Sequence, residues 1–183
     1  MIGEIRDLET AQIAVQASLT GHLVLATLHT NDAPGAVTRL IDMGIEPYLL
    51  ASTLDGVLAQ RLVRKLCAAC RAPYEPDATE RSAFHAPSPL GEGRGGGAAA
   101  PERLYKAVGC GACNFSGYKG RTGIYELFTT DDDTRRLIHD TAAESDLRER
   151  AVHAGMVRLR EDGLRWVRDG STSLDEVLRV TRT

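Results

Sequence analysis

Apolar residues in the first part of the chain alternate between strand-length and helix-length runs. Residues 1–5 read as the end of a buried strand, and residues 22–28 form a short apolar run typical of a strand buried on both faces. Helix-length runs fill residues 8–19 and 34–41, and the second is expected to stop at Gly44. Strand, helix, strand and helix in this order predict an α/β sheet.

Two aspartates stand where these helices are expected to begin. Asp32 precedes Pro34, which suits the first turn of a helix, so that Asp32 is predicted to be the N-cap. Asp7 has the same relation to the first helix. Capping is the interpretation that we favour for Asp7, ahead of a role in orienting Arg6.

Two later stretches are harder to assign. Residues 47–66 fit a helical leucine stripe and a strand alternation equally well, and the pattern leaves both open. Residues 86–101 are rich in Gly, Pro and Ala, have nothing to bury, and are expected to form a disordered loop. They do not form a phosphate-binding loop, because no Lys-Ser or Lys-Thr follows them.

The remainder of the chain is predicted to be one short strand followed by helices. The strand covers residues 121–128, and helical runs follow between residues 131 and 167. A last helix opens at Ser173, whose spacing to Glu176 is that of a capping box. We expect a small helical unit at this end of the chain.

The composition narrows the class of protein. The 183 residues are 43% hydrophobic and 26% charged, which is typical of a globular protein. The formal net charge of −3 and the lack of a basic, aromatic stripe argue against a nucleic-acid binder. No apolar run approaches the roughly 20 residues that span a bilayer. Any membrane association is therefore expected to go through a partner.

All four cysteines stand in two close pairs, Cys67-Ala-Ala-Cys70 and Cys110-Gly-Ala-Cys113. Two such pairs offer four sulfurs to one tetrahedral Zn²⁺ ion at about 2.3 Å. The 39 residues between the pairs exceed the roughly 15 to 20 of common zinc ribbons. Closing that loop costs about 3 kcal/mol, whereas structural zinc contributes on the order of 10 kcal/mol. The spacing is therefore compatible with a structural zinc site.

Other roles for the cysteines are two disulfides, a redox-active pair, or four unrelated buried thiols. The N-terminus carries charges where a secretory signal needs an apolar stretch. This indicates a reducing, cytosolic compartment, in which structural disulfides are disfavoured. Structural zinc is the interpretation that we favour.

Glu4 and His29 each close one of the predicted strands. An acidic residue at a strand end is where P-loop ATPases hold Mg²⁺ or polarise the attacking water. A carboxylate in this place is more often a solvated cap, and a strand-end histidine is by itself more often a solvent-exposed side chain. The two residues alone do not decide between these interpretations.

The sequence segments around Glu4 and His29 favour the catalytic interpretation, because they resemble the secretion ATPase superfamily of type II secretion and type IV pilus motors. The segments that carry the resemblance are residues 3–11 (GEIRDLETA), 20–24 (TGHLV), 27–31 (TLHTN), 41–48 (IDMGIEPY), 58–64 (LAQRLVR), 117–126 (GYKGRTGIYE), 160–164 (REDGL) and 172–177 (TSLDEV), together with the cysteine pairs. They look like the traffic ATPase family of type II secretion, the general secretory pathway protein E family. The pilus assembly ATPases are the nearest siblings.

The resemblance implies roles for individual residues. Glu4 corresponds to the Walker B carboxylate, which acts on Mg²⁺ and its water ligand beside the γ-phosphate of ATP. His29 corresponds to the histidine of the family's His box. Arg6, Arg39 and Arg121 are candidates for contacting nucleotide phosphates or the acidic surface of a neighbouring subunit. Arg121 is the favoured one, because it lies in the family's Gly-Arg-Thr-Gly segment, and Arg39 is expected on a solvated helix face. Cys67, Cys70, Cys110 and Cys113 are the implied zinc ligands.

The resemblance also implies an architecture: the C-terminal part of a RecA-like P-loop ATPase domain, with an α/β fold. Residues 1–66 would belong to the ATPase core, residues 67–113 to a zinc-binding tetracysteine subdomain that contains the loop 86–101, and residues 114–183 to a returning strand and a helical subdomain. The implied partners are a homo-hexamer and the cytoplasmic domain of an inner-membrane secretion assembly protein. The expected location is cytoplasmic, peripheral at the bacterial inner membrane.

One motif of the family is missing from the sequence. No Gly-x-x-x-x-Gly-Lys-Ser/Thr occurs, so that the phosphate-cradling loop and its lysine are absent. We therefore expect the chain alone neither to bind Mg-ATP tightly nor to hydrolyse it. Three functions stay open: part of the motor that drives pseudopilus assembly in type II secretion, part of a type IV pilus assembly ATPase, or a non-catalytic zinc-stabilised docking module.

Overall fold

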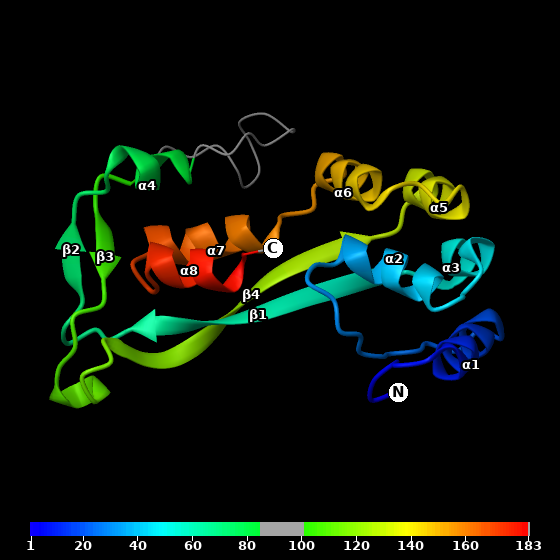
Figure 1. Ribbon diagram of the computed structural model, residues 1–183, viewed down its shortest axis with the longest axis horizontal. Coiled ribbons are helices and arrows are strands. Elements are labelled where there is room, and N and C mark those ends of the chain that lie inside the picture. The colour runs from blue at the N-terminus through cyan, green and yellow to red at the C-terminus, as the bar shows by residue number, and fades with distance from the viewer. Residues whose placement is uncertain (85–100, 183) are drawn as a thin grey trace. The chain divides into compact units, whose positions relative to one another are not determined.

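The computed structural model describes residues 1–84 and 101–182, and within them it combines helices with two small sheets (Figure 1). The elements are α1 (Leu8–Leu19), α2 (Pro34–Asp42), α3 (Pro47–Thr53), β1 (Gly56–Leu66), β2 (Ala72–Tyr74), α4 (Ala78–Ser82), β3 (Leu104–Lys106), the 3₁₀ helix η1 (Gly111–Cys113), β4 (Tyr118–Thr129), α5 (Asp132–His139), α6 (Glu144–His153), α7 (Leu159–Arg168) and α8 (Leu174–Val180). The loop expected at residues 86–101 lies outside the described residues except for Pro101.

The elements pack as two compact units. The first contains residues Met1–Ala59 and Leu127–Met156, and the second contains Gln60–Glu126 and Val157–Thr183. The strands β1 and β4 pair with each other, and each contributes residues to both units. The predicted division of the chain into residues 1–66, 67–113 and 114–183 is not tested by the limits of these two units, and it stays a prediction.

In the first unit, the two apolar runs predicted as strands are extended segments rather than regular strands. The Ile2 and Ile5 amides donate to the carbonyls of Leu25 and Thr27, at 2.8 and 2.9 Å, so the segments lie side by side. The Leu23 and Leu25 residues are 80% and 58% exposed. The expectation of a strand buried on both faces is therefore wrong, because no layer within the described residues covers these side chains.

The first two helices begin as their aspartates predict. The Asp7 carboxylate accepts a hydrogen bond from the Thr10 amide at 2.8 Å, which confirms it as the N-cap of α1. At α2 the N-cap position is Ala33, and Asp32 acts from one residue earlier by accepting the Gly35 amide at 2.9 Å. Asp32 therefore does bind an amide at the start of α2, as expected, but it stands one residue before the N-cap position.

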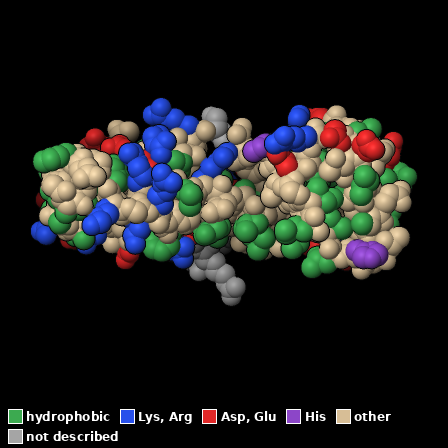
Figure 2. All heavy atoms as spheres, turned by 90° about the horizontal axis from the view of Figure 1, so that it is seen from below, with side chains coloured by type: hydrophobic (Ala, Val, Ile, Leu, Met, Phe, Trp, Pro, Cys, Tyr) green, Lys and Arg blue, Asp and Glu red, His purple; other side chains and the backbone are tan. Residues whose placement is uncertain are grey.

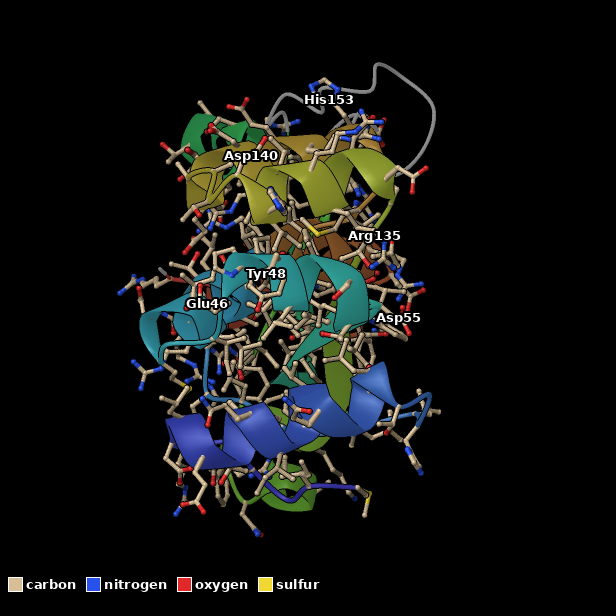
Figure 3. All side chains as sticks on the ribbon, turned by 90° about the vertical axis from the view of Figure 1, so that its right-hand side faces the viewer. Glu46, Tyr48, Asp55, Arg135, Asp140 and His153 are labelled. Carbon is tan, nitrogen blue, oxygen red and sulfur yellow. The ribbon has the colours of Figure 1, made fainter. Side chains whose placement is uncertain are left out.

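The ambiguous stretch 47–66 contains both elements, α3 followed by β1. Arg135 of α5 fixes the change from helix to strand. It donates to the Ala51 carbonyl at 2.5 Å and lies 3.4 Å from the Asp55 carboxylate, and Figure 3 labels Arg135 and Asp55 at this end of α3. The Ala51 carbonyl, in the last turn of α3, therefore has its partner on a different helix, α5.

The core of the first unit is aliphatic and draws on every helix of the unit. Its buried members are Ile5, Ala11, Ala14, Val15, Ala33, Val37, Ile45, Leu50, Ala51, Phe128, Ile138, Leu147, Ala151, Val152 and Met156. The core joins residues before 60 to residues after 126, so the first unit can form only when the chain returns through β4.

The second unit is built around the paired strands β1 and β4. The Cys67 amide donates to the Gly117 carbonyl at 2.9 Å, just beyond one end of each strand, which confirms a returning strand and extends the predicted residues 121–128 to Tyr118–Thr129. The strands β2 and β3 pair antiparallel, with Ala72 opposite Lys106. The sequence pattern assigned no element to β2, α4 or β3.

Two helices of the second unit approach closely at a glycine. A Cβ atom on Gly163 of α7 would lie 2.6 Å from Cγ1 of Val177 on α8, and both residues are buried. The absence of a side chain therefore sets the distance between α7 and α8.

Replacing Gly163 by Ala is expected to lower the free energy of unfolding. Alanine favours a helix by about 1 kcal/mol, but overpacking a buried contact costs typically about 1–3 kcal/mol. The stiff Val177 side chain has no space to move into, so the net change is a loss of stability. Urea unfolding of Gly163→Ala measures it, with Gly3→Ala as the control, because nothing lies within 4 Å of a Cβ there. Equal or higher stability of Gly163→Ala contradicts the close packing.

A buried carboxylate ties α8 to β1. Glu176 is 1% exposed and accepts from Nε and Nη2 of Arg64 at 3.0 and 2.7 Å, and from Nε and Nη2 of Arg179 at 2.9 and 2.8 Å. The Arg64 guanidinium also stacks on the Tyr118 ring, 4.1 Å from its centre. Ser173 caps α8 by accepting the Glu176 amide at 3.3 Å. The hydrogen bond from the Glu176 amide to Ser173 confirms one half of the predicted capping box. The Glu176 carboxylate, which would form the other half, binds the two arginines instead.

The two units differ in charge. The first contains six arginines and fourteen Asp and Glu residues, whereas the described part of the second contains fifteen Lys and Arg and ten Asp and Glu. On the face shown in Figure 2, Lys and Arg side chains gather over the end that carries β2 and β3. Among the described residues, no helix has the length and apolar character to cross a bilayer.

Candidate metal centre and candidate active site

The four cysteine sulfurs meet at one point of the second unit. The Sγ atoms of Cys67, Cys70, Cys110 and Cys113 all lie within 4.8 Å of one another. Three of the separations are 4.0 Å (Cys67 to Cys110), 3.8 Å (Cys70 to Cys113) and 3.8 Å (Cys110 to Cys113). A tetrahedron with zinc–sulfur bonds of about 2.3 Å has edges of about 3.8 Å. The cluster therefore has the dimensions of a tetrathiolate metal site.

Each cysteine pair is held by the same kind of turn. The Cys70 amide donates to the Cys67 carbonyl, and the Cys113 amide donates to the Cys110 carbonyl, both at 3.1 Å. Gly109 precedes the second turn with a φ of +109°, and a Cβ there would lie 2.6 Å from the carbonyl oxygen of residue 115. The pairs are local in sequence, and the contact between β2 and β3 brings the two turns together.

Backbone amides surround the sulfurs and favour thiolates. The Cys113 sulfur accepts from the amides of Cys110 and Gly117 at 3.2 and 3.3 Å, and the Cys70 sulfur accepts from Gly109 at 3.3 Å. Burial raises the pKa of Cys113, but these amides outweigh it and the pKa falls to about 6. Burial raises the pKa of Cys70 to about 11. Four neighbouring thiols cannot all ionise without a cation, so the donor set fits a divalent metal.

The second cluster lies in the first unit and joins the predicted catalytic residues. Oε1 of Glu4 lies 2.7 Å from Nε2 of His29, and Oε2 accepts from Nε of Arg6 at 2.7 Å. The paired segments at residues 1–5 and 24–28 bring Glu4 and His29 to the same end. The side chain of Glu4 is 19% exposed and that of His29 is 90% exposed, so the imidazole faces solvent while the carboxylate is mostly covered.

The electrostatics of this cluster keep Glu4 ionised. The hydrogen bond from Arg6 holds the pKa of Glu4 below its usual range, and the charges of Arg6 and His29 act in the same direction. An ionised carboxylate at a strand end is able to bind a magnesium-bound water or accept a proton from it.

The fourth predicted residue lies elsewhere. Arg121 is an exposed residue of β4 in the second unit, and it has no ion-pair partner within residues 1–84 and 101–182. The structure thus brings Glu4, His29 and Arg6 together and places Arg121 in the other unit. The catalytic and nucleotide-binding roles of these four residues stay predictions.

Sequence reasoning missed a contact beside the cluster. Nη2 of Arg148, on α6, donates to Oδ2 of Asp32 at 2.6 Å. The two residues are 116 positions apart, and no local pattern links them. The one available signal was the Glu144 and Arg148 spacing on a predicted helix, which shows a pair within α6 and nothing about Asp32.

The arrangement of the elements resembles part of two solved ATPase structures. The chain resembles the crystal structure of the pilus retraction motor PilT with bound ADP, with a TM-score of 0.61 and 22% identity over 99% of this chain and 38% of that chain. It also resembles the ATPase DotB of Yersinia pseudotuberculosis, with a TM-score of 0.61 and 21% identity over 98% of this chain and 35% of that one. At these identities the likeness shows the fold alone: this chain has the fold of about a third of each of those two chains.

Sequence comparison gives the family. The family model for "Type II/IV secretion system protein" matches residues 1–179. The whole chain is 62% identical to the type II secretion system protein HxcR of Pseudomonas aeruginosa and 57% identical to the type II secretion system ATPase E of Vibrio cholerae. Over 99% of the chain, identity to the type IV pilus assembly ATPase PilB of Myxococcus xanthus is 48%. The chain belongs to the type II secretion system ATPase E family, which confirms the resemblance in its sequence.

The match covers only part of the relatives. The chain spans 33% of the length of the Pseudomonas protein, 34% of the Vibrio protein and 31% of the Myxococcus protein. The activity and partners of those longer proteins therefore enter here as proposals.

Proposed function

We propose that the chain forms part of a motor ATPase that powers type II secretion by coupling ATP hydrolysis to pseudopilus assembly. The observation that carries the proposal is the contact of 2.7 Å between Glu4 and His29, at one end of two paired extended segments. The 62% identity to a type II secretion protein supports secretion over pilus assembly.

The proposed mechanism assigns a separate task to each side chain. Glu4, kept ionised by Arg6, would hold Mg²⁺ through a water ligand and accept a proton from the attacking water. His29 would donate a hydrogen bond from its exposed ring to phosphate or water. Arg6 and Arg121 would bind phosphate oxygens, Arg6 after leaving Glu4. Mg²⁺ would neutralise charge on the transferred phosphoryl group.

The charge of the first unit supports the expectation that the chain alone is inactive. Its fourteen acidic residues outnumber its six arginines. Arginines at positions 6, 135, 136, 148 and 150 are already paired with carboxylates. ATP carries several negative charges, so the excess of carboxylates in this unit repels it, and the sequence has no phosphate-binding loop to offset that repulsion. Micromolar Mg-ATP affinity in isothermal titration would show this expectation to be wrong.

We propose zinc as the metal of the cysteine cluster, and a structural role for it. Four sulfur ligands leave no open position for substrate, which is the arrangement of structural zinc sites. Neither member of the other cluster, Glu4 or His29, belongs to the same unit as the cysteines.

The proposed partners follow from the family. The intact protein would form a homo-hexamer and bind the cytoplasmic domain of an inner-membrane secretion assembly protein, which would place it peripherally at the cytoplasmic side of that membrane. A type IV pilus assembly motor is the second candidate, supported by the 48% identity to PilB of Myxococcus xanthus. A zinc-stabilised docking module without catalysis is the third, supported by the closed cysteine cluster alone.

The catalytic proposal is tested by restoring a P-loop half from a relative and measuring ATPase activity. Glu4→Gln is expected to reduce turnover at least about 100-fold, because the amide cannot accept a proton. Far-UV circular dichroism is expected to be unchanged. Glu9→Gln is the matched control, because Glu9 is an exposed acid in the first turn of the neighbouring α1. Equal activity of Glu4→Gln and Glu9→Gln would leave the docking module as the better function.

A further inference from the structure

Asp32 makes two contacts within the loop that follows His29, one through its backbone and one through its side chain. Its backbone carbonyl accepts from the Thr30 hydroxyl at 2.9 Å, and its Oδ1 accepts from the Gly35 amide at 2.9 Å. Ala33, between these contacts, is fully buried. The position of the loop therefore depends on where the Asp32 carboxylate is held.

The second oxygen of that carboxylate is held by α6. Nη2 of Arg148 donates to Oδ2 of Asp32 at 2.6 Å, and the same nitrogen contacts Glu144 one turn earlier on α6. The side chain of Asp32 is 15% exposed and that of Arg148 is 31% exposed. Solvent-exposed ion pairs contribute little, but a mostly covered carboxylate that loses its cation becomes costly to keep in place.

Gly35 packs closely against this contact. A Cβ on Gly35 would lie 2.8 Å from Oδ1 of Asp32 and 3.5 Å from Oε2 of Glu144. The first turn of α2, the Asp32 carboxylate and the start of α6 are therefore in direct contact, and a shift in one displaces the others.

We propose that the Arg148–Asp32 ion pair is a positioning device that fixes the loop after His29 and thereby holds the imidazole against Glu4. Arg148 touches neither Glu4 nor His29 and acts through Asp32. Its consequence for catalysis rests on the proposed function, whereas its effect on the loop does not. The pair also makes the Glu4–His29 contact sensitive to the position of α6.

The test compares Arg148→Met with Arg136→Met in the 183-residue chain. Arg136 is a matched control, because it is a helical arginine paired with a carboxylate, Asp133, at 2.9 Å, and its side chain is 75% exposed. Amide hydrogen exchange by NMR is the first measurement. Arg148→Met is expected to accelerate exchange of the amides at residues 30–33 and at Gly35 about tenfold and to leave those of α1 unchanged, since it removes a charge-assisted hydrogen bond.

The second measurement is the rate at which diethyl pyrocarbonate modifies His29. Glu4→Gln is the positive control, because it weakens the partner of Nε2 directly. Arg148→Met is expected to accelerate modification as Glu4→Gln does, and Arg136→Met is not. Arg148→Lys, which keeps the charge with a single donor group, is expected to recover part of the protection. Gly35→Ala is expected to loosen the same loop without changing charge.

Two results would overturn the inference. One is unchanged exchange and unchanged His29 modification in Arg148→Met. The other is equal acceleration at every amide including those of α1, which would reduce Arg148 to a contributor to global stability. No nucleotide enters either measurement. A failure of the ATPase test on Glu4 therefore leaves the positioning result intact, and the reverse also holds.

Discussion

Chelating the zinc that we propose for the four cysteines is expected to unfold the two cysteine turns. Their sulfurs lie 3.8 to 4.0 Å apart, and without a cation the thiols can ionise only in part. Structural zinc contributes on the order of 10 kcal/mol in small sites, against about 3 kcal/mol for closing the loop between the pairs. A thermal transition of the second unit at clearly lower temperature is the expected result.

Metal analysis and calorimetry measure this effect. One zinc ion per chain is expected, and its removal by a strong chelator should be reversed by adding zinc back. Cys67→Ser is expected to reproduce the loss, whereas Ser82→Ala, in the same unit and away from the cluster, is not. Four freely reacting thiols, no bound metal and an unchanged transition would remove the zinc proposal.

Replacing Glu176 by Gln is expected to destabilise the chain by about 1–3 kcal/mol, because the neutral amide loses the charge-assisted hydrogen bonds from Arg64 and Arg179, whose half-exposed guanidinium groups stay solvated. Urea unfolding at neutral pH measures this loss. Asp175→Asn is the control, since Asp175 is the exposed neighbour on α8 and loses the same charge. Equal effects of the two substitutions would show that Glu176 contributes no more than a surface acid.

The same carboxylate gives the chain a defined acid sensitivity. Burial raises the pKa of Glu176, but the hydrogen bonds from Arg179 and Arg64 outweigh it and lower the pKa from 4.5 to about 2. A group whose pKa is lower in the folded state stabilises the fold above its unfolded pKa. This stability, about 3 kcal/mol, is lost as the pH falls from about 4.5 to about 2. The difference between wild type and Glu176→Gln is expected to shrink through that window.

Local signals in the sequence were sufficient where the structure depends on neighbours in the chain. Asp7 caps α1 by binding the amide three residues later, and Ser173 caps α8 in the same way. The cysteine turns are equally local, with contacts of three residues. For Asp32 the pattern predicted the right carboxylate, but the N-cap position itself is Ala33, one residue later.

The expectation failed where burial depends on distant layers. An apolar run such as residues 22–28 shows that side chains prefer to be covered, and it does not show what covers them. Leu23 and Leu25 are exposed because the described residues supply no layer over them. Residues 47–66 were undecided for the same reason: α5 ends the helix through Arg135, and β4 forms the strand by pairing.

By itself the sequence determined the family, most of the helices, the caps of α1 and α8, and the two cysteine pairs, because each of these depends on residues close together in the chain. Only the tertiary structure decided which distant side chains meet. Glu176 pairs with Arg64, which is 112 positions away in the sequence, and Asp32 pairs with Arg148, which is 116 positions away. The sequence position of a charged residue does not indicate which distant residue it will pair with. The partner is selected when packing excludes water around both and leaves one neighbour within hydrogen-bonding distance.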